Sequence, residues 1–393
     1  MSKVPRILMM CLADPAGNPR PYRAIHLFAQ HKYSVDTLSF KPSKMLPVEQ
    51  SYTIPALSRA IPNRLYRLSF SCLQSLLVNL GSFGKKLSLL CNAKRYGISK
   101  IKPSLQVQPY DLILVEDLQL LPLAFDIKGS ARIIFDAREF YTRQNEELLR
   151  FKILEARFRD FLLRDYATQC DSAITVSDGL RDEYQKIYSI PMKVVRSSPP
   201  FQEVSLKPTD DHFRMVHHGA ANKNRGLDNM IEIVRRLGGR FSLDFYLVGS
   251  SIHIDRLQKK ADGCNRIRFL PPVQFDQIIP MLCEYDIGFF YCEPTTFNLK
   301  HCLPNKFFEF IQARLALAIG PSPEMARLVR KYQCGFVSPE FSLNSMVQTL
   351  AGLSASSIDT AKACSDKAAR DLCYENESSK LLSIARRLMK MHN

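Results

Sequence analysis

The chain has no acidic residue between positions 50 and 110, although its 393 residues include 38 Asp and Glu. Residues 1–110 hold sixteen Lys or Arg against Asp14, Asp36 and Glu49, a local balance of +13 within a net charge of +16. Such a one-sided excess favours an anionic partner over a merely solvated basic face. Nucleic acid and an anionic membrane surface are both candidates.

Long apolar runs are absent as well. The longest uncharged stretch of this basic region, LSFSCLQSLLVNLGSFG (68–84), is interrupted by four serines, Gln74, Asn79 and two glycines, whereas a membrane span needs roughly 20 mostly apolar residues. The run PRILMMCL (5–12) is short and leads into Asp14, so it reads as a first strand rather than a signal peptide. We therefore expect no transmembrane helix.

The basic stretch does mix Leu and Phe with Arg and Lys at roughly helical spacing, as in Arg64, Arg67, Lys85 and Lys86. This mixture is typical of a helix that lies on a bilayer surface. We therefore favour an anionic membrane surface, contacted through residues 50–110, and expect no nucleic-acid partner.

Paired cysteine motifs are also missing, because none of the eleven cysteines forms a C-x-x-C pair. Neither a disulfide framework nor a zinc site is indicated by such spacing. Free thiols in a reducing cytoplasm are the simplest interpretation.

What is present is a repeated alternation of short apolar runs and longer amphipathic ones, which is typical of βα units and a parallel sheet. The alternation stops at RSSPPFQEVSLKPTDDHF, where three prolines and many polar residues mark a linker, and then resumes. The sequence predicts an N-terminal Rossmann-like domain (1–195), a linker (196–213), a second Rossmann-like domain (214–372) and a C-terminal helix (373–393) that packs back on the first domain.

The expected elements follow from the same alternation. In the first half we expect strands at 6–12, 34–40, 112–116, 132–136 and 172–176 and helices at 20–31, 118–128, 146–169 and 178–188, with Ser177 as an N-cap. In the second half we expect strands at 213–218, 242–249, 266–270, 286–291 and 315–319 and helices near 226–238, 252–261, 274–284 and 304–315. In such sheets ligands lie beyond the carboxyl ends of the strands, so the loops there are the place to seek a site.

The stretch CLPNKFFEFIQ (302–312) places charge at the start of an otherwise apolar helix. Pro304 suits the first helical turn, and Lys306 and Glu309, three residues apart, share one face. The free N–H groups of a helix N-terminus together with Lys306 suit a phosphate, while the carboxylate of Glu309 suits the two hydroxyls of a ribose. Phosphate and ribose together indicate a nucleotide.

A second stretch, VHHGAANKNRGLDNMI, runs from a strand through a polar loop into a helix. Gly219 permits close approach of the backbone to a ligand, and Arg225 suits a diphosphate. His217 and His218 are interpreted as strand-end residues rather than metal ligands, since no further ligand stands at suitable spacing.

These stretches, with FYLVGSS, IRFLPPVQFDQIIPMLCEYDIGFF and LPNKFFEFIQARLALAIGPSPEM, resemble the donor domain of glycosyltransferase family 4, which has the GT-B fold. DPAGNPRPYRAIHLFAQ, PYDLILVEDLQLLPLA, FDAREFY and DSAITVSDGL are similar to the acceptor domain of that family. The resemblance covers most of the chain in the right order. It implies an α/β fold of two Rossmann-like parallel-sheet domains that face an interdomain cleft.

The resemblance further implies retaining transfer of a sugar from a nucleotide-sugar donor, UDP- or GDP-linked, without a covalent enzyme intermediate. Arg225 and Lys306 would neutralise the leaving diphosphate, Glu309 would hold the ribose, and Arg138 would also act at the reacting sugar. The implied donor-binding residues are Gly17, Gly219, Asn224, Arg225, Gly249, Val273, Asn305, Lys306 and Glu309.

Acidic residues follow two neighbouring strands of the first domain. We expect the acceptor to be bound by Glu116, Asp117, Asp136, Arg138 and Glu139, although capping of helix N-termini is an alternative role for these acids. No cofactor or metal is expected, because there is no D-x-D motif and the cationic side chains can take the part of a metal on the diphosphate.

Three positions depart from the pattern of the family. His301 stands eight positions before Glu309 where a second glutamate is common, Ala220 stands where an arginine follows the glycine, and Arg138 replaces a histidine in D-x-H-E. Ala220 makes the diphosphate more dependent on Arg225.

The leading hypothesis is a cytoplasmic glycosyltransferase, peripherally attached to the inner face of the membrane, that acts on a saccharide or lipid-linked acceptor in the biosynthesis of a surface polysaccharide such as lipopolysaccharide or capsule. Two alternatives stay open at this point. One is a nucleotide-sugar epimerase of the same fold, which needs acid and base groups beside the sugar. The other is a basic nucleic-acid or partner-binding protein with a degenerate nucleotide pocket.

Overall fold

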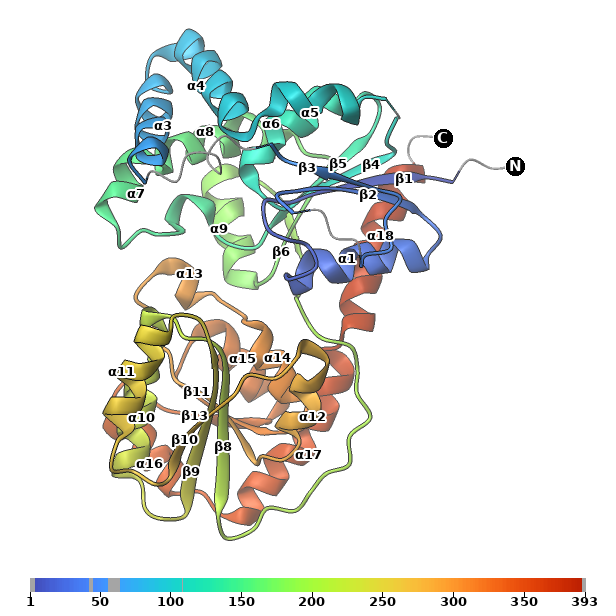
Figure 1. The fold of residues 1–393 in the computed structure, drawn as a ribbon. Coiled ribbons are helices and arrows are strands. Elements are labelled where there is room, and N and C mark those ends of the chain that lie inside the picture. Colours follow the sequence, from blue (N-terminus) through green and yellow to red (C-terminus); the bar gives the residue numbers. More distant parts are fainter. Residues whose placement is uncertain (1–3, 42–44, 56–63, 108, 391–393) are drawn as a thin grey trace. The chain divides into compact units, whose positions relative to one another are not determined.

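The computed structural model describes residues 4–41, 45–55, 64–107 and 109–390, with the backbone alone for residues 64–69. The chain divides into two compact units (Figure 1). Unit 1 comprises Met1–Arg196, Thr296–Asn298 and Ser378–Asn393, and unit 2 comprises Ser197–Thr295 and Leu299–Glu377. Each unit is an α/β layer structure built on its own parallel sheet.

The sheet of unit 1 has seven parallel strands in the order β3-β2-β1-β4-β5-β6-β7. The strands are β1 (Arg6–Met10), β2 (Ser34–Ser39), β3 (Gln50–Thr53), β4 (Leu112–Val115), β5 (Arg132–Ala137), β6 (Ser172–Thr175) and β7 (Met192–Val194). The central strands are continuous apolar runs because helices cover both faces of the sheet.

Helices of unit 1 connect these strands. They are α1 (Pro19–Gln30), α3 (Arg64–Leu77), α4 (Gly81–Tyr96), α5 (Ile98–Leu105), α6 (Leu121–Ile127), α7 (Leu149–Leu154), α8 (Ala156–Asp165) and α9 (Asp178–Tyr188), with short 3-10 turns at Leu118–Leu120, Tyr141–Arg143 and Ala167–Gln169. Asn18 caps α1, its side chain accepting a hydrogen bond from the Arg20 N–H.

Unit 2 repeats the arrangement with six parallel strands in the order β10-β9-β8-β11-β12-β13. The strands are β8 (Phe213–Ala220), β9 (Phe241–Val248), β10 (Ile267–Leu270), β11 (Ile287–Phe290), β12 (Ala316–Ile319) and β13 (Gly335–Val337). The helices are α10 (Leu227–Arg236), α11 (Ser251–Ala261), α12 (Ile278–Leu282), α14 (Asn305–Gln312), α15 (Pro323–Tyr332), α16 (Leu343–Ala351) and α17 (Ala355–Asp371), with 3-10 turns at Lys223–Arg225 and Phe275–Gln277. The short helix α13 (Phe297–Lys300) begins in unit 1 and ends in unit 2.

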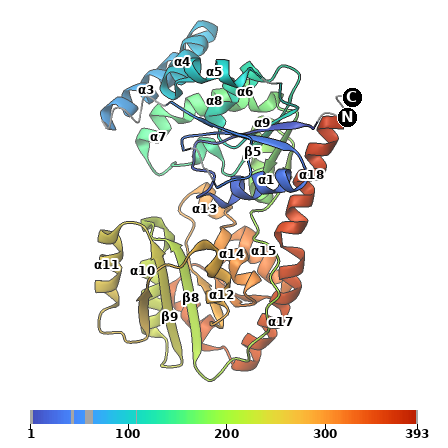
Figure 2. The same ribbon diagram turned by 45° about the vertical axis from the view of Figure 1, so that its right-hand side comes forward.

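The last helix, α18 (Tyr374–Lys390), passes from one unit to the other, since its residues from Ser378 onward belong to unit 1. There it runs beside α1 in both views (Figures 1 and 2). Among the described residues, no helix combines the length and the apolar character that crossing a bilayer requires.

In both sheets the order of strands reverses at a central pair. In unit 1 the chain winds outward from β1 on one side and from β4 on the other, and in unit 2 from β8 and β11. The loops that follow such a pair diverge to opposite faces of the sheet and leave a crevice at its carboxyl edge. The residues after β1, β4, β8 and β11 therefore occupy the positions where this architecture binds ligands.

Some expected elements differ from the structure. The predicted helix 146–169 is broken into α7, α8 and a 3-10 turn, because Glu155 leaves the helical region with φ −125° and ψ −39°. The edge strands β3, β7 and β13 are not predicted by the sequence, because the short and partly exposed segments QSYT, MKV and GFV are not continuous apolar runs.

Two capping expectations also need correction. Pro304 lies at the N-cap of α14, one residue before the first turn in which it was expected. Ser177 occupies the N-cap of α9 with an extended backbone, but its side chain makes no capping hydrogen bond.

Candidate functional site

The candidate site of unit 2 lies at the carboxyl ends of β8 and β11, where the strand order reverses. The strand β8 ends in His217, His218 and Gly219, and the 3-10 turn that follows it contains Arg225. The first turns of α14 contribute Lys306 and Glu309. The structure thus brings residues from two separate stretches of the sequence together at one edge of the sheet.

Lys306 is held by the end of β8. Its Nζ lies 3.0 Å from Nε2 of His217 and 5.3 Å from the centre of the Phe290 ring. It also lies over Gly219, where an added Cβ would stand 3.2 Å from Nζ. Because Gly219 has a φ of +109°, a glycine suits this position, and the ammonium of Lys306 occupies the space above its backbone.

The pKa of Lys306 lies near neutral pH. Burial, and next the nearby guanidinium of Arg225, lower the pKa of Lys306 to about 7, while the carboxylate of Glu309 opposes this shift. Two cations so close together in the empty protein repel each other. An anion placed between them would relieve the repulsion and restore the proton on Lys306.

Glu309 is only 5% exposed and faces the other histidine of the pair. His218 Nε2 lies 3.3 Å from Oε2 of Glu309. Burial and the charge of Lys306 lower the pKa of His218 to about 3, so its ring is neutral and the contact is not an ion pair. The negative charge of Glu309 is therefore not cancelled by the histidine beside it.

The other predicted donor-binding residues lie at the same strand ends or near them. The carbonyl of Asn224 accepts a 3.4 Å hydrogen bond from the Cys292 thiol after β11, and Gly249, with φ +135°, follows β9 beside Ala221. Asn305 is the first residue of α14. Val273 lies half-buried in the loop after β10.

A second cluster lies at the carboxyl edge of the sheet in unit 1. Asp117 Oδ2 accepts a 2.6 Å hydrogen bond from the backbone N–H of Leu12, which ties the loop after β4 to the loop after β1. The Arg138 guanidinium lies 3.3 Å from Asp117 Oδ1 and 3.8 Å from Glu116 Oε2. Burial lowers the pKa of Arg138, but Glu116 and the neighbouring acids raise it by a larger amount. The pKa of Arg138 therefore lies above its usual value.

Glu116 is fully buried, and neither of its carboxyl oxygens has a hydrogen-bond partner within the described part of the chain. Burial raises its pKa to about 8, against the opposing charge of Arg138. Its carboxyl group therefore takes up a proton more readily than that of an ordinary glutamate, and in the protonated form it can donate a hydrogen bond.

Asp136 has a different surrounding from that of the other predicted acceptor residues. Both of its oxygens accept hydrogen bonds from Arg20, at 2.6 and 2.7 Å, and Arg20 also donates to the carbonyl of Val195. The pair is almost completely buried. Asp136 therefore joins α1, β5 and the segment after β7, and an acceptor would meet a carboxylate that is already paired.

The remaining predicted positions are less specific. Nothing in the described fold requires glycine at position 17, since an added Cβ would meet only the carbonyl of Asp14, 3.9 Å away. Glu139 is half-buried, and its carbonyl accepts a hydrogen bond from Tyr184. Their roles as donor-binding and acceptor-binding residues stay predictions.

Comparison with solved structures identifies the architecture. Sucrose-phosphate synthase from Thermosynechococcus elongatus matches with a TM-score of 0.74 at 10% identity, over 98% of this chain and 100% of that one. A glycosyltransferase from Rickettsia africae matches with a TM-score of 0.69 at 12% identity, over 98% of this chain and 99% of that one. HepE from Anabaena, solved with UDP and glucose, matches with a TM-score of 0.66 at 11% identity, over 96% of this chain and 98% of that one.

The fold is GT-B. This confirms the expected fold class of two Rossmann-like parallel-sheet domains. No model of a protein family matches the chain, and no curated protein matches it in sequence. At 10–12% identity the solved GT-B structures show the fold alone, so function has to be argued from the residues at the strand ends.

The burial of Glu116 in the first GT-B unit leads to a prediction on stability. A carboxyl group whose pKa is raised on folding stabilises the fold below its unfolded pKa, about 4.3, and loses this contribution as the pH rises through about 8. Glu116→Gln keeps the shape without the titration. We expect the variant to gain stability relative to the wild type between pH 6 and pH 9.

The measurement is urea unfolding at pH 6 and at pH 9, monitored by hydrogen exchange in the strands of unit 1. Glu147→Gln, at an exposed position, is the matched control and should show no such change. A difference between Glu116→Gln and the wild type that does not vary with pH would contradict the prediction.

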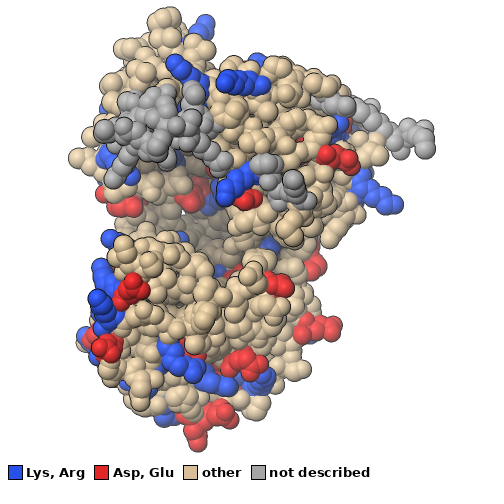
Figure 3. Space-filling model, viewed as in Figure 1, with Lys and Arg blue, Asp and Glu red and all other residues tan. Residues whose placement is uncertain are grey.

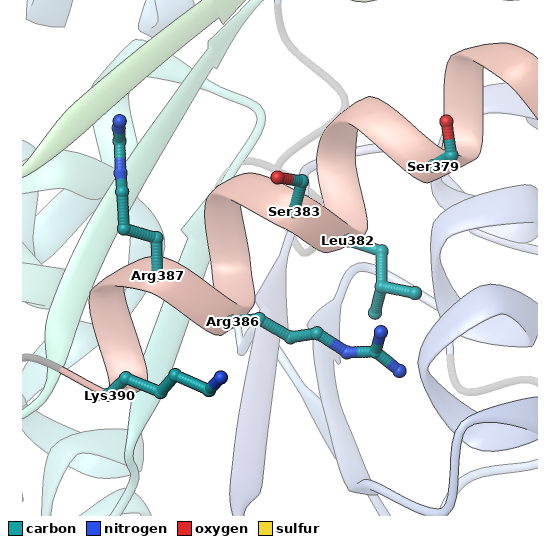
Figure 4. A pocket seen from close by; sticks show the side chains of 6 residues that line it. All are labelled: Ser379, Leu382, Ser383, Arg386, Arg387 and Lys390. Carbon is teal, nitrogen blue, oxygen red and sulfur yellow. The ribbon is translucent and has the colours of Figure 1, made fainter.

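A cavity of about 600 Å³ lies elsewhere on the GT-B fold, on α18 (Figure 4). It is lined by Ser379, Leu382, Ser383, Arg386, Arg387 and Lys390. Figure 4 shows Arg386 and Lys390 reaching to the same side of the helix as Leu382. Cations in the last turns of a helix are stabilised by its dipole, which accounts for these charges, so we assign no ligand to the cavity.

Proposed function

We propose that this protein is a retaining glycosyltransferase that moves a sugar from a nucleotide-sugar donor to a saccharide or lipid-linked acceptor. The observation that carries the proposal is the cluster of Arg225, Lys306 and Glu309 at the point where the strand order of unit 2 reverses. Solved neighbours of the same fold include a UDP-forming synthase and a protein bound to UDP and glucose, which favours UDP over GDP as the carrier.

In this reaction the cluster has to stabilise the leaving group. As the bond between the sugar and the diphosphate breaks, negative charge grows on the diphosphate. Lys306 and Arg225 meet this charge with preorganised cations, so that no divalent metal is required. The ring of His218 beside Glu309 is neutral, and the carboxyl oxygens of Glu309 are suited to accept hydrogen bonds from the ribose hydroxyls.

Acceptor contacts are proposed for unit 1. The carboxylate of Asp117 and the guanidinium of Arg138, with the buried carboxyl of Glu116 behind them, form one polar group at the end of β4 and β5. Such a group has both donors and acceptors for the hydroxyls of a sugar. Biosynthesis of a cell-surface polysaccharide is the role that we propose for this activity.

The first test is turnover. Purified protein is incubated with UDP- and GDP-linked sugars in the presence of EDTA, after a thermal-shift screen has selected the donors that raise the melting temperature. We expect release of the nucleoside diphosphate and transfer of the sugar without added metal. Glu309→Gln should lower kcat/KM for the donor by about tenfold or more, as expected for the loss of a hydrogen bond to a charged group.

Glu284→Gln, at an exposed position, is the control that should behave as the wild type. Unchanged kinetics in Glu309→Gln at limiting and saturating donor would remove this residue from the site. Activity only with added Mn²⁺ or Mg²⁺ would contradict metal independence. A product that is an epimer of the donor, still joined to its nucleotide, would identify an epimerase instead.

Attachment to the membrane is proposed for the helical hairpin of α3 and α4. Large apolar side chains on it are exposed, namely Leu73, Leu76, Leu80, Phe83 and Leu90. Phe83, Lys86, Leu90 and Lys94 follow one another at helical spacing, so apolar and basic groups share a face of α4. In Figure 3 the protruding end of this hairpin shows basic and uncharged atoms and no acidic ones.

One of the cations expected to take part has another role. Lys85 pairs with Asp165 at 2.8 Å and lies 5.0 Å from the centre of the Phe161 ring, so it is engaged in packing α4 against α8. Arg64 and Arg67 have side chains outside the described residues. The docking face is therefore assigned to Leu76, Leu80, Phe83, Lys86 and Lys94.

Sedimentation with vesicles tests this face. The wild type should bind anionic vesicles in preference to neutral ones, since each basic residue near such a surface adds on the order of 1 kcal/mol. Lys86→Gln with Lys94→Gln should abolish the preference for anionic vesicles. Leu76→Ser with Leu80→Ser and Phe83→Ser should reduce binding to both.

Ile252→Ser with Phe275→Ser, which removes exposed apolar side chains from unit 2, is the matched control. If the wild type does not prefer anionic vesicles, or if the hairpin variants bind as the control does, docking by this hairpin is wrong. Turnover on a water-soluble acceptor would be unaffected by these changes.

A further inference from the structure

We propose that His217 is a positioning residue that holds the ammonium of Lys306 over the backbone of Gly219, in the place where the diphosphate of the donor binds. The inference rests on the proposed function and deepens it, because it explains how one flexible lysine is preorganised for an anion.

The ring of His217 is locked between aromatic neighbours. The side chain is completely buried. It stacks on Phe290 with 5.9 Å between ring centres and 5° between planes, and it meets Phe245 edge-on at 5.9 Å. A ring packed in this way cannot turn without displacing the core, so its two nitrogens keep fixed directions.

The hydrogen bonds of the ring determine which nitrogen carries the proton. Nδ1 lies 2.9 Å from the carbonyl of Phe289, an acceptor, so Nδ1–H donates there. Nε2 then has a free lone pair and accepts a hydrogen bond from Nζ of Lys306 at 3.0 Å. Burial and the charge of Lys306 lower the pKa of His217 well below the usual value, which keeps the ring neutral.

A neutral acceptor is the useful partner for a lysine that has to bind an anion. A carboxylate in the place of His217 would cancel the positive charge of Lys306. The imidazole uses one of its three N–H groups and leaves the charge intact. The Phe290 ring, 5.3 Å below Nζ, supports the ammonium from another side.

Preorganisation matters because a free lysine side chain loses rotamer entropy when it is ordered. Because His217 already orders Lys306 in the folded protein, this entropy is not lost again when the diphosphate binds. Since the charge on the leaving group grows during the reaction, a misplaced Lys306 should lower kcat more than it raises KM.

The test compares two substitutions of His217 that differ in which nitrogen they mimic. The amide nitrogen of Asn can replace Nδ1 and keep the bond to Phe289, whereas the longer Gln reaches the position of Nε2 and can accept from Lys306. We expect His217→Asn to lower the affinity for UDP by about tenfold and kcat by more, and His217→Gln to stay within about threefold of the wild type. Circular dichroism and the melting temperature check that each variant folds.

Equal affinities and rates in His217→Asn and His217→Gln would overturn the proposal, provided that Lys306→Met loses both. If Lys306→Met also binds UDP as the wild type does, the failure belongs to the proposed donor site. A readout independent of activity is the ¹⁵N spectrum of labelled histidine. His217 should show an unprotonated Nε2 from pH 5 to 8 whose shift changes in Lys306→Met, and a protonated Nε2 in the wild type would overturn the proposal by itself.

Discussion

Lys306→Met is expected to lower the affinity for UDP roughly 10- to 100-fold at pH 6.5. The substitution keeps the apolar stem of the side chain and removes the charge that lies over Gly219. A hydrogen bond to a charged group contributes about 1.5–3 kcal/mol, and each 1.4 kcal/mol is a factor of ten in affinity. Isothermal titration calorimetry with UDP measures the effect directly.

The pH dependence of binding distinguishes this lysine from other cations. Because the pKa of Lys306 is about 7 in the empty protein, an anion that binds its charged form should bind more weakly as the pH rises above 7. Binding should also take up protons, seen as a heat that depends on the ionisation enthalpy of the buffer. In Lys306→Met both the proton uptake and this part of the pH dependence should vanish.

The pH dependence that Lys306 gives to folding stability is opposite to the one it gives to binding. A lysine whose pKa falls on folding binds more protons in the unfolded chain, so its contribution to stability is complete above about pH 10.4 and is lost as the pH falls through about 7. Lys306→Met should therefore stabilise unit 2 at pH 6.5 while it weakens binding. Lys259→Met, at an exposed position on α11, is the control and should change neither quantity. Wild-type affinity in Lys306→Met at pH 6.5 would remove this lysine from the donor site.

Much of the fold could be predicted because parallel strands buried on both faces are continuous apolar runs. The runs RILMM, LILV and ALAI are strands in the structure, and their order along the chain already indicated two βα domains. The loops after β1, β4 and β8 could be singled out in advance for the same reason. The proximity of Lys306 to Gly219 depends on the packing of α14 against β8 and became visible only in the structure.

The role of His217 could not be read from the sequence. Two adjacent histidines at a strand end point to opposite faces of a sheet, and the sequence does not say which face carries Lys306. In the structure both rings are buried and they differ in their partners, since His217 accepts from Lys306 while His218 faces Glu309. The pattern H-H-G before a polar loop, with a lysine at the start of a later helix, is the signal that was available.

The pairing of Arg20 with Asp136 was also invisible, because 116 residues separate the two positions. Arg20 lies in the first turn of α1 and its side chain is 9% exposed, while the side chain of Asp136 is 4% exposed. Asp136 is predicted to bind the acceptor because it follows a strand. In the structure its oxygens are occupied by a side chain that no local pattern connects to it.

Arg20→Met is consequently expected to destabilise unit 1 by about 3–5 kcal/mol, the cost of leaving one member of a buried ion pair without its partner. Methionine fills a similar volume, so the loss reflects the unpaired carboxylate of Asp136 and the released carbonyl of Val195. Urea unfolding followed by hydrogen exchange in β1, α1 and β5 measures the stability of unit 1 separately from that of unit 2.

Two comparisons decide whether the buried carboxylate is the cause. In the double variant Arg20→Met with Asp136→Asn no charge is left unpaired, so much of the lost stability should return. Arg164→Met, which breaks the exposed pair with Asp160, should cost only about 0.5 kcal/mol because solvent screens that pair. If Arg20→Met is no more destabilising than Arg164→Met, the pair does not hold α1 to the sheet.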